Sequence, residues 1–228
     1  MYTPDSVQSS PITLSATVES QVYSLFAVAV ALTGVGVFVG LLYLDALFPL
    51  QIVLLFAELA IIFTAPWWAK SSPLNYLMFG LFPLFSGITI APFLLYVTTE
   101  YANGFSILLN ALASTALMAG AAAVFARTTQ WNLGFMGRFL FLGIIGLLVM
   151  GLLQIFFPSL RGGQMEIWLS GAGVVLFSLF IAYDIQRIQH LSRLGTSPFL
   201  LALSLYLDIY NLFLYVVRFM LAISGRRD

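Results

Sequence analysis

Seven long apolar stretches, separated by short polar connectors, dominate the pattern of this 228-residue chain. Each stretch has about the 20 residues that an α-helix needs to cross a bilayer. The pattern therefore predicts an all-α integral membrane bundle of seven spans, at about Val22–Leu42, Leu50–Trp68, Leu74–Val97, Phe105–Ala126, Gly134–Phe157, Met165–Gln186 and Pro198–Ile223. The connectors are too short to hold a further domain and carry most of the charges.

The composition agrees with an integral membrane protein. Hydrophobic residues make up 61% of the chain and charged residues 8%, and the mean hydropathy is +1.01, whereas soluble domains carry roughly 25% charged residues. Cysteine is absent, which excludes disulfides and thiolate metal sites. Nine basic and nine acidic residues balance, so nothing indicates nucleic-acid binding. We expect residues 1–20 to be a flexible polar tail, 21–224 the transmembrane domain and 225–228 a short C-terminal tail.

The basic residues predict the orientation in the membrane. One face of a seven-span bundle carries Lys70, Arg127, Arg138, Arg187 and Arg193, and the other carries Arg161, Arg226 and Arg227, with Arg218 near the end of the last span. Because short cytoplasmic loops are enriched in Lys and Arg, the N-terminus is expected in the cytoplasm and the C-terminus outside. Trp67, Trp68, Trp131 and Trp168 lie near span ends and are expected to be interfacial anchors.

Small residues and prolines predict local features of the spans. Gly36 and Gly40 form a GxxxG pattern, and Ala119–Ala123 with Gly120, and Gly143 with Gly146, give similar small faces suited to close helix packing. Pro83 and Pro92 each remove a hydrogen bond from the third span and should bend it.

Three carboxylates, those of Glu58, Asp184 and Asp208, lie deep in the spans. Asp208 is expected roughly 15 Å from the cytoplasmic end of the last span, and Asp184 roughly 5–10 Å in from the same face. A charge at this depth is costly and marks a functional site by default. Because a short connector joins the last two spans, Asp184 and Asp208 should meet across them. Arg138, Glu166 and Arg218 lie near span ends and are expected to snorkel.

The last span carries a polar stripe. Ser204, Asp208, Asn211 and Tyr215 follow the i, i+4, i+7, i+11 spacing of one helix face. A lipid-facing helix would not carry it, so this span is expected at the centre, wrapped by the other six.

An acidic set without bases suits cations or protons. Two adjacent carboxylates should bind protons as a coupled pair and share one proton as a closed latch. Calcium prefers oxygen ligands, and so few ligands favour a transient site. Structural alternatives remain. Asp184 could pair only with Arg187, Asp208 could be protonated and bonded to Asn211 or a neighbouring helix, and Glu58 could serve packing alone. His190 lies in a charged connector and is expected to be exposed.

These residues also carry a family resemblance. The segment Leu203–Phe213, which reads LSLYLDIYNLF, resembles the signature of the Bax inhibitor family, the transmembrane BAX-inhibitor-motif proteins. Tyr183-Asp184 with Gln186 and Ile188 is similar to the preceding helix of that family. Ser86–Thr89 followed by Pro92 resembles its third helix, and Glu58 with Trp67 its second. The resemblance covers all seven spans and is nearest to the prokaryotic calcium-leak branch.

The resemblance implies a pH-sensitive calcium leak channel, gated by a pair of aspartates on the cytoplasmic side. Carried over by motif, this pair is Asp184 and Asp208, which would also hold calcium transiently, and Glu58 is a pathway acid. Ser204 and Asn211, on the stripe of Asp208, are expected to line the same path. Bacterial relatives carry a basic cluster after the second span, where this chain keeps only Lys70. Lys70 and Arg187 are the expected basic partners of the pair.

Two other functions are also compatible with the sequence: a proton-coupled cation transporter, or a membrane scaffold that regulates partner proteins. An enzyme is not expected. Intramembrane aspartyl proteases need Gly-x-Gly before the second aspartate, where this chain has Leu205-Tyr206-Leu207. A serine protease would need a histidine inside the membrane, but the single histidine is His190. We expect no cofactor beyond permeant calcium and regulatory protons, no nucleic-acid partner, a monomer, and a bacterial plasma (inner) membrane as the location.

Overall fold

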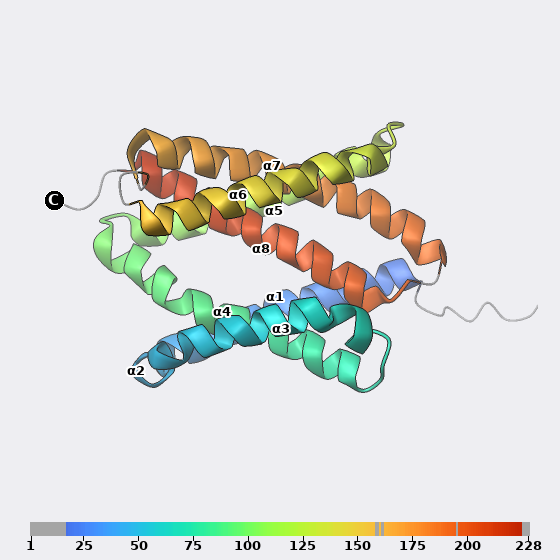
Figure 1. Ribbon diagram of the computed structural model, residues 1–228, viewed down its shortest axis with the longest axis horizontal. Coiled ribbons are helices and arrows are strands. Elements are labelled where there is room, and N and C mark those ends of the chain that lie inside the picture. Colours follow the sequence, from blue (N-terminus) through green and yellow to red (C-terminus); the bar gives the residue numbers. More distant parts are fainter. Residues whose placement is uncertain (1–16, 158–159, 161, 195, 225–228) are drawn as a thin grey trace, which may run out of the picture.

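The computed structural model describes residues 17–157, 160, 162–194 and 196–224, which form a bundle of long helices without a strand (Figure 1). The long helices are α1 (Val18–Leu42), α3 (Gln51–Trp68), α4 (Leu74–Glu100), α5 (Gly104–Thr128), α6 (Met136–Phe156), α7 (Gly163–Leu191) and α8 (Pro198–Ile223). Short turns precede α3 (α2, Leu44–Leu47, and η1, Phe48–Leu50), precede α6 (η2, Leu133–Phe135) and follow α7 (η4, Ser192–Leu194). Seven segments of this described part are long and apolar enough to cross a membrane, which confirms the predicted fold class.

Two helices extend furthest beyond the spans that the sequence predicted. The first begins at Val18, where the Thr17 hydroxyl accepts the N–H of Ser20 and caps the helix. Residues 18–20 are therefore helical and not part of a tail, while residues 1–16 and 225–228 lie outside the described part. The α7 helix continues to Leu191, because Ile188 is still buried against the bundle. Arg187 and His190 thus belong to a helix, not to a connector, and His190 is exposed as expected.

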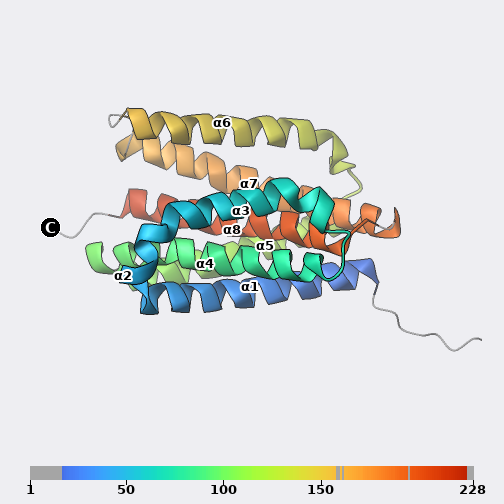
Figure 2. The ribbon, with the colours of Figure 1, turned by 60° about the horizontal axis from the view of Figure 1, so that its bottom comes forward.

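The predicted central position of the last span is confirmed by its burial. Half of the most apolar part of α8 is buried, the largest share of any span. It packs against α1, α4, α5 and α7, while α3 rests mainly on α4 and α6 mainly on α7 at the outside of the bundle (Figure 2). The outward faces carry exposed apolar side chains such as Phe63, Phe139 and Leu148, as a lipid-facing surface requires.

The tightest helix contact joins α1 and α4 through glycines. Gly36 and Gly40 of α1 lie against Gly87 and Ile88 of α4, and a Cβ atom on Gly36 would overlap the carbonyl oxygen of Leu84. The GxxxG prediction is therefore confirmed. The same reasoning was wrong for Gly120 and Gly146, because a Cβ atom on either would meet no atom within 4 Å.

The third span is one continuous helix, α4, despite its two prolines. Pro92 leaves the carbonyl of Ile88 without its usual helical donor, and the Gln51 side chain donates to that oxygen at 3.4 Å. The helix therefore continues past Pro92, and α3 supplies a replacement donor for the freed carbonyl group.

Among the tryptophans, Trp67, Trp131 and Trp168 are exposed near span ends, as expected of anchors. The prediction was wrong for Trp68, which is 3% exposed. Its indole N–H donates to the carbonyl oxygen of Ile61 at 2.8 Å, so the buried ring has the hydrogen-bond partner that it needs.

The α1–α4 contact makes a testable prediction. Replacement Gly36→Ala should lower the free energy of unfolding by about 1–3 kcal/mol, because the added methyl group must displace a backbone carbonyl. Thermal unfolding in detergent measures the effect. The matched control is Gly34→Ala, two residues away on the same helix, where an added Cβ meets nothing within 4 Å. Equal melting temperatures for both variants would contradict a close-packed glycine contact.

Candidate functional site

Asp184 of α7 and Asp208 of α8 are both buried inside the bundle, with 2% and 6% of their surfaces exposed. The two helices run antiparallel and pack along their length, which brings the two carboxyl groups into interaction. The predicted meeting of the two aspartates is thus observed. In each carboxyl group the Oδ2 atom has no hydrogen-bond partner in the described structure. A buried oxygen of this kind is costly, so the pair favours a shared proton or a cation.

Both aspartates face one cavity of about 340 Å³ between α6, α7 and α8. The wall from α6 is apolar (Ile144, Leu147 and Leu148), whereas the other two helices supply the polar groups. All four members of the predicted stripe line this cavity, namely Ser204, Asp208, Asn211 and Tyr215. The cavity therefore offers carboxylate, hydroxyl and amide groups in an apolar setting.

Arg187 is the basic group of this cavity. Its Nη1 atom lies 3.6 Å from Oδ1 of Asp184, and 43% of its side chain is exposed. A charge-assisted hydrogen bond is shorter, near 2.7–2.9 Å, so Arg187 holds Asp184 only loosely. The expected Asp184–Arg187 pair and the expected aspartate pair are both present. Asn211 donates to the carbonyl oxygen of Leu207 in its own helix at 2.7 Å, and that bond occupies one donor of its amide.

Glu58 does not line this cavity. Its carboxylate accepts hydrogen bonds from Thr89 at 2.9 Å and from Ser86 at 3.3 Å, both on α4. Tyr210 of α8 in turn donates to the carbonyl oxygen of Ser86 at 3.0 Å. Glu58 therefore lies on another side of α8, and the structure does not place it with Asp208 in one continuous cavity.

Lys70 also lies apart from the aspartates. It is exposed and lines a different cavity, beside Ser197 and the first turn of α8. Of the two expected basic partners, only Arg187 reaches the pair.

The sequence reasoning missed a polar cluster near the opposite end of the same three helices. Arg218 of α8 contacts both carboxylate oxygens of Glu166 of α7, at 2.7 and 3.1 Å. Gln154 of α6 donates to Glu166 at 3.2 Å and accepts from Arg218 at 3.3 Å. Glu166 and Arg218, which were expected to snorkel separately, are thus partners of each other. Their opposite charges near the same end of two antiparallel helices were the signal.

The site has few ligands for a metal ion. Within the described residues, no group of three or more His, Cys, Asp or Glu side chains could hold a metal. Calcium normally takes six to eight oxygen ligands. Two carboxylates with Ser204 and Asn211 could therefore hold calcium only together with water.

Comparison with known proteins places this arrangement in a family. The family model described as "Inhibitor of apoptosis-promoting Bax1" (Bax1-I) matches residues 15–226. An uncharacterized protein of Helicobacter pylori (strain ATCC 700392 / 26695) is 33% identical over 205 residues, which cover 90% of this chain and 86% of that protein.

Two relatives carry names. Inner membrane protein YbhL of Escherichia coli (strain K12) is 28% identical over 189 residues, 78% of this chain and 76% of its own. Protein LIFEGUARD 4 of Arabidopsis thaliana is 30% identical over 169 residues, 72% of this chain and 64% of its own. With this match across most of its length and seven helices long enough to span a bilayer, the chain belongs to the Bax inhibitor family of multi-pass membrane proteins.

Proposed function

We propose that this protein is a pH-sensitive calcium leak channel, with Asp184 and Asp208 as its sensor and gate. The observation that carries the proposal is the pair of buried carboxyl groups that face one cavity with two oxygens lacking partners. Such groups inside a membrane bundle are expensive, and ion or proton movement is their usual role.

The chemistry of the cavity supports a cation as the permeant species. Its polar groups are mainly oxygen donors suited to a hard cation, with Ser204 and Asn211 beside Asp208 on one helix face. A leak needs binding weak enough for the ion to leave again, and two carboxylates with water meet that need. Glu58 serves as a further pathway acid in this proposal, reached only after α4 and α8 shift.

In this proposal, the contact between Arg187 and Asp184 keeps the path closed. The Arg187 guanidinium belongs to the next turn of α7 and lies 3.6 Å from Asp184. While Asp184 is ionised, the attraction keeps the arginine across the end of the cavity. Protonation of Asp184 removes its charge and releases Arg187, while Asp208 keeps the charge that attracts the cation, so acid opens the path. The other titratable groups facing the pair are Tyr183 and Tyr215, and the α6 wall carries none.

A proton-coupled cation transporter is the second candidate. One observation favours it: the aspartate cavity stays within α6, α7 and α8, and the Arg218–Glu166–Gln154 cluster ties these three helices near their other end. In alternating access, one group of helices rocks against the rest around a binding site near the middle of the membrane. Saturable flux that moves protons in a fixed ratio would separate a transporter from a leak.

A scaffold that regulates partner proteins is the remaining alternative. If the protein is such a scaffold, Asp208→Asn should leave the binding of those partners unchanged.

We further propose a bacterial inner membrane as the location, with the N-terminus in the cytoplasm. The name of YbhL as an inner membrane protein and the excess of Lys and Arg on the face that holds Lys70, Arg127 and Arg187 support this. The proposal includes a monomer, no resident cofactor and no enzymatic activity.

The first prediction concerns calcium flux into proteoliposomes loaded with a calcium dye. Asp208→Asn should reduce the flux about tenfold or more, because it removes the deepest charge that attracts the cation. The matched control is Asp45→Asn, an identical change at an exposed carboxylate in α2, which should keep wild-type flux. Absence of flux above empty liposomes in the wild type would overturn the channel proposal.

The second prediction concerns pH. Wild-type flux should rise as the pH falls from about 8 to about 5, because protonation of the pair releases Arg187. Asp184→Asn mimics the protonated residue, so its flux should stay near the acid level at every pH. The same dye assay measures both proteins. A pH profile in Asp184→Asn that follows the wild type would exclude this residue as the sensor.

A further inference from the structure

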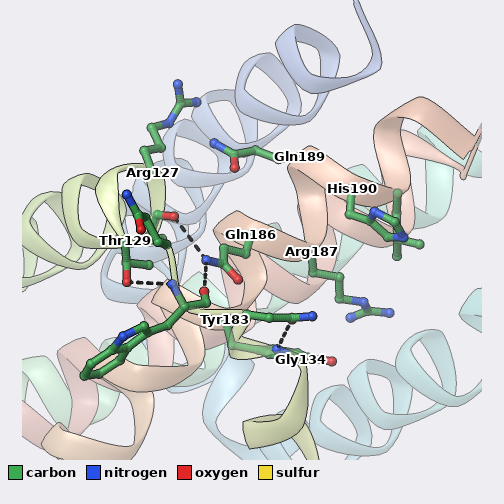
Figure 3. A pocket seen from close by; sticks show the side chains of 13 residues that line it. Arg127, Thr129, Gly134, Tyr183, Gln186, Arg187, Gln189 and His190 are labelled. Carbon is green, nitrogen blue, oxygen red and sulfur yellow. Dashed lines mark hydrogen bonds between the residues drawn. The ribbon is translucent and has the colours of Figure 1, made fainter.

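A second cavity, of about 620 Å³, opens where the end of α5 and the connector to α6 meet the last turns of α7 (Figure 3). We call it the basic vestibule. Arg127, Arg187 and His190 line it, together with the side-chain amides of Gln130 and Gln189. None of the residues that line it carries a carboxylate. The vestibule therefore combines cationic groups with neutral hydrogen-bond donors.

The vestibule lies at the ends of two helices that are long and apolar enough to span a membrane, because α5 ends at Thr128 and α7 at Leu191. Trp131, on the vestibule wall, is exposed, as a ring at the membrane interface would be. Basic pockets between transmembrane helices on the cytoplasmic side suit anionic headgroups.

The wall of the vestibule is held in place by its own hydrogen bonds. The Gln186 side chain donates to the carbonyl oxygen of Trp131 at 2.8 Å and accepts the N–H of Leu133 at 2.9 Å. The Asn132 side chain accepts the N–H of Gly134 at 2.9 Å, as drawn in Figure 3. These bonds fix the connector against α7, so the pocket exists before a ligand arrives.

The basic side chains of the vestibule differ in how many partners they have. Arg127 is bound to Glu19 and Tyr23 of α1. Among the described residues, Arg187 has only the long contact to Asp184 and is 43% exposed, and His190 is exposed. Arg187 and His190 are three residues apart on one helix face, so they offer donors that one anion could reach together.

We propose that the basic vestibule binds a phosphate group, supplied by the headgroup of an anionic phospholipid. Arg187 and His190 hold the phosphate, and Arg127 adds attraction from the other side. Free inorganic phosphate has the same chemistry, so the test distinguishes the two sources. The proposal does not depend on ion flux, since binding is measured directly.

The site has a consequence for the aspartates, because Tyr183 and Arg187 line both the vestibule and the aspartate cavity. A phosphate in the vestibule competes with Asp184 for the same guanidinium. The occupied vestibule therefore draws Arg187 away from the pair.

Native mass spectrometry of the detergent-purified protein tests the proposal, with phosphatidylglycerol and phosphatidylcholine of identical acyl chains. The wild type should bind the first phosphatidylglycerol about tenfold more tightly than phosphatidylcholine. The double variant Arg187→Gln/His190→Gln should lose most of this preference. Lys70→Gln removes one cation from the same face outside the vestibule, and should change the preference less than about twofold.

Two further measurements cover a double variant that does not fold and separate the lipid from free phosphate. If the double variant elutes as aggregate, Arg187→Lys, which keeps the charge, should retain the preference while Arg187→Gln loses it. Inorganic phosphate is then titrated into the lipid complex: displacement of phosphatidylglycerol would show that free phosphate also occupies the site, and no displacement would assign the site to the lipid. Equal binding of both lipids by the wild type, or an unchanged preference without Arg187 and His190, would overturn the proposal.

Discussion

Two carboxylates buried with too few hydrogen-bond partners constrain how the last two helices pack. Asp184 and Asp208 face each other between α7 and α8, and each keeps one oxygen without a partner in the described structure. An apolar bundle tolerates this only if a proton, a cation or water joins the pair. The cavity beside them, closed by the apolar wall of α6, gives that third participant its space. The position of α8 at the centre follows, because no helix that carries such a face could turn it to lipid.

The central helix is polar on a second side as well. There the hydroxyl groups of Tyr206 and Thr33 share a hydrogen bond of 2.7 Å, and Tyr210 bonds to the backbone of Ser86. These bonds attach α8 to α1 and α4, and through Ser86 to Glu58. The helix is therefore fixed by satisfied hydrogen bonds on one side and left with unsatisfied oxygens on the other. The side with Tyr206 and Tyr210 attaches α8 to α1 and α4, whereas the side with Asp208 faces the aspartate cavity.

Features set by one helix at a time were predictable from the sequence, and features set by contacts between helices mostly were not. The seven spans follow from hydropathy, and the stripe from Ser204 to Tyr215 from helical periodicity. The pairing of Asp184 with Asp208 followed because a short connector makes their helices neighbours. Glu166 and Arg218 were missed because their partnership depends on side-chain reach across α7 and α8. Gly120 was misjudged since a small residue packs closely only if a partner helix faces it, and the sequence does not say which face that is.

The glycine contact between α1 and α4 makes one part of the bundle more tightly packed than the rest. Backbone touches backbone at Gly36 and Gly87 without room for a methyl group, so neither helix can slide past the other there without a backbone clash. The α6 helix, by contrast, rests mainly on α7 and lies at the outside of the bundle (Figure 2). Of the three helices around the aspartate cavity, α6 is therefore the one that contacts the fewest other helices. Its wall of the cavity can move with less disturbance to the rest of the bundle than the walls formed by α7 and α8.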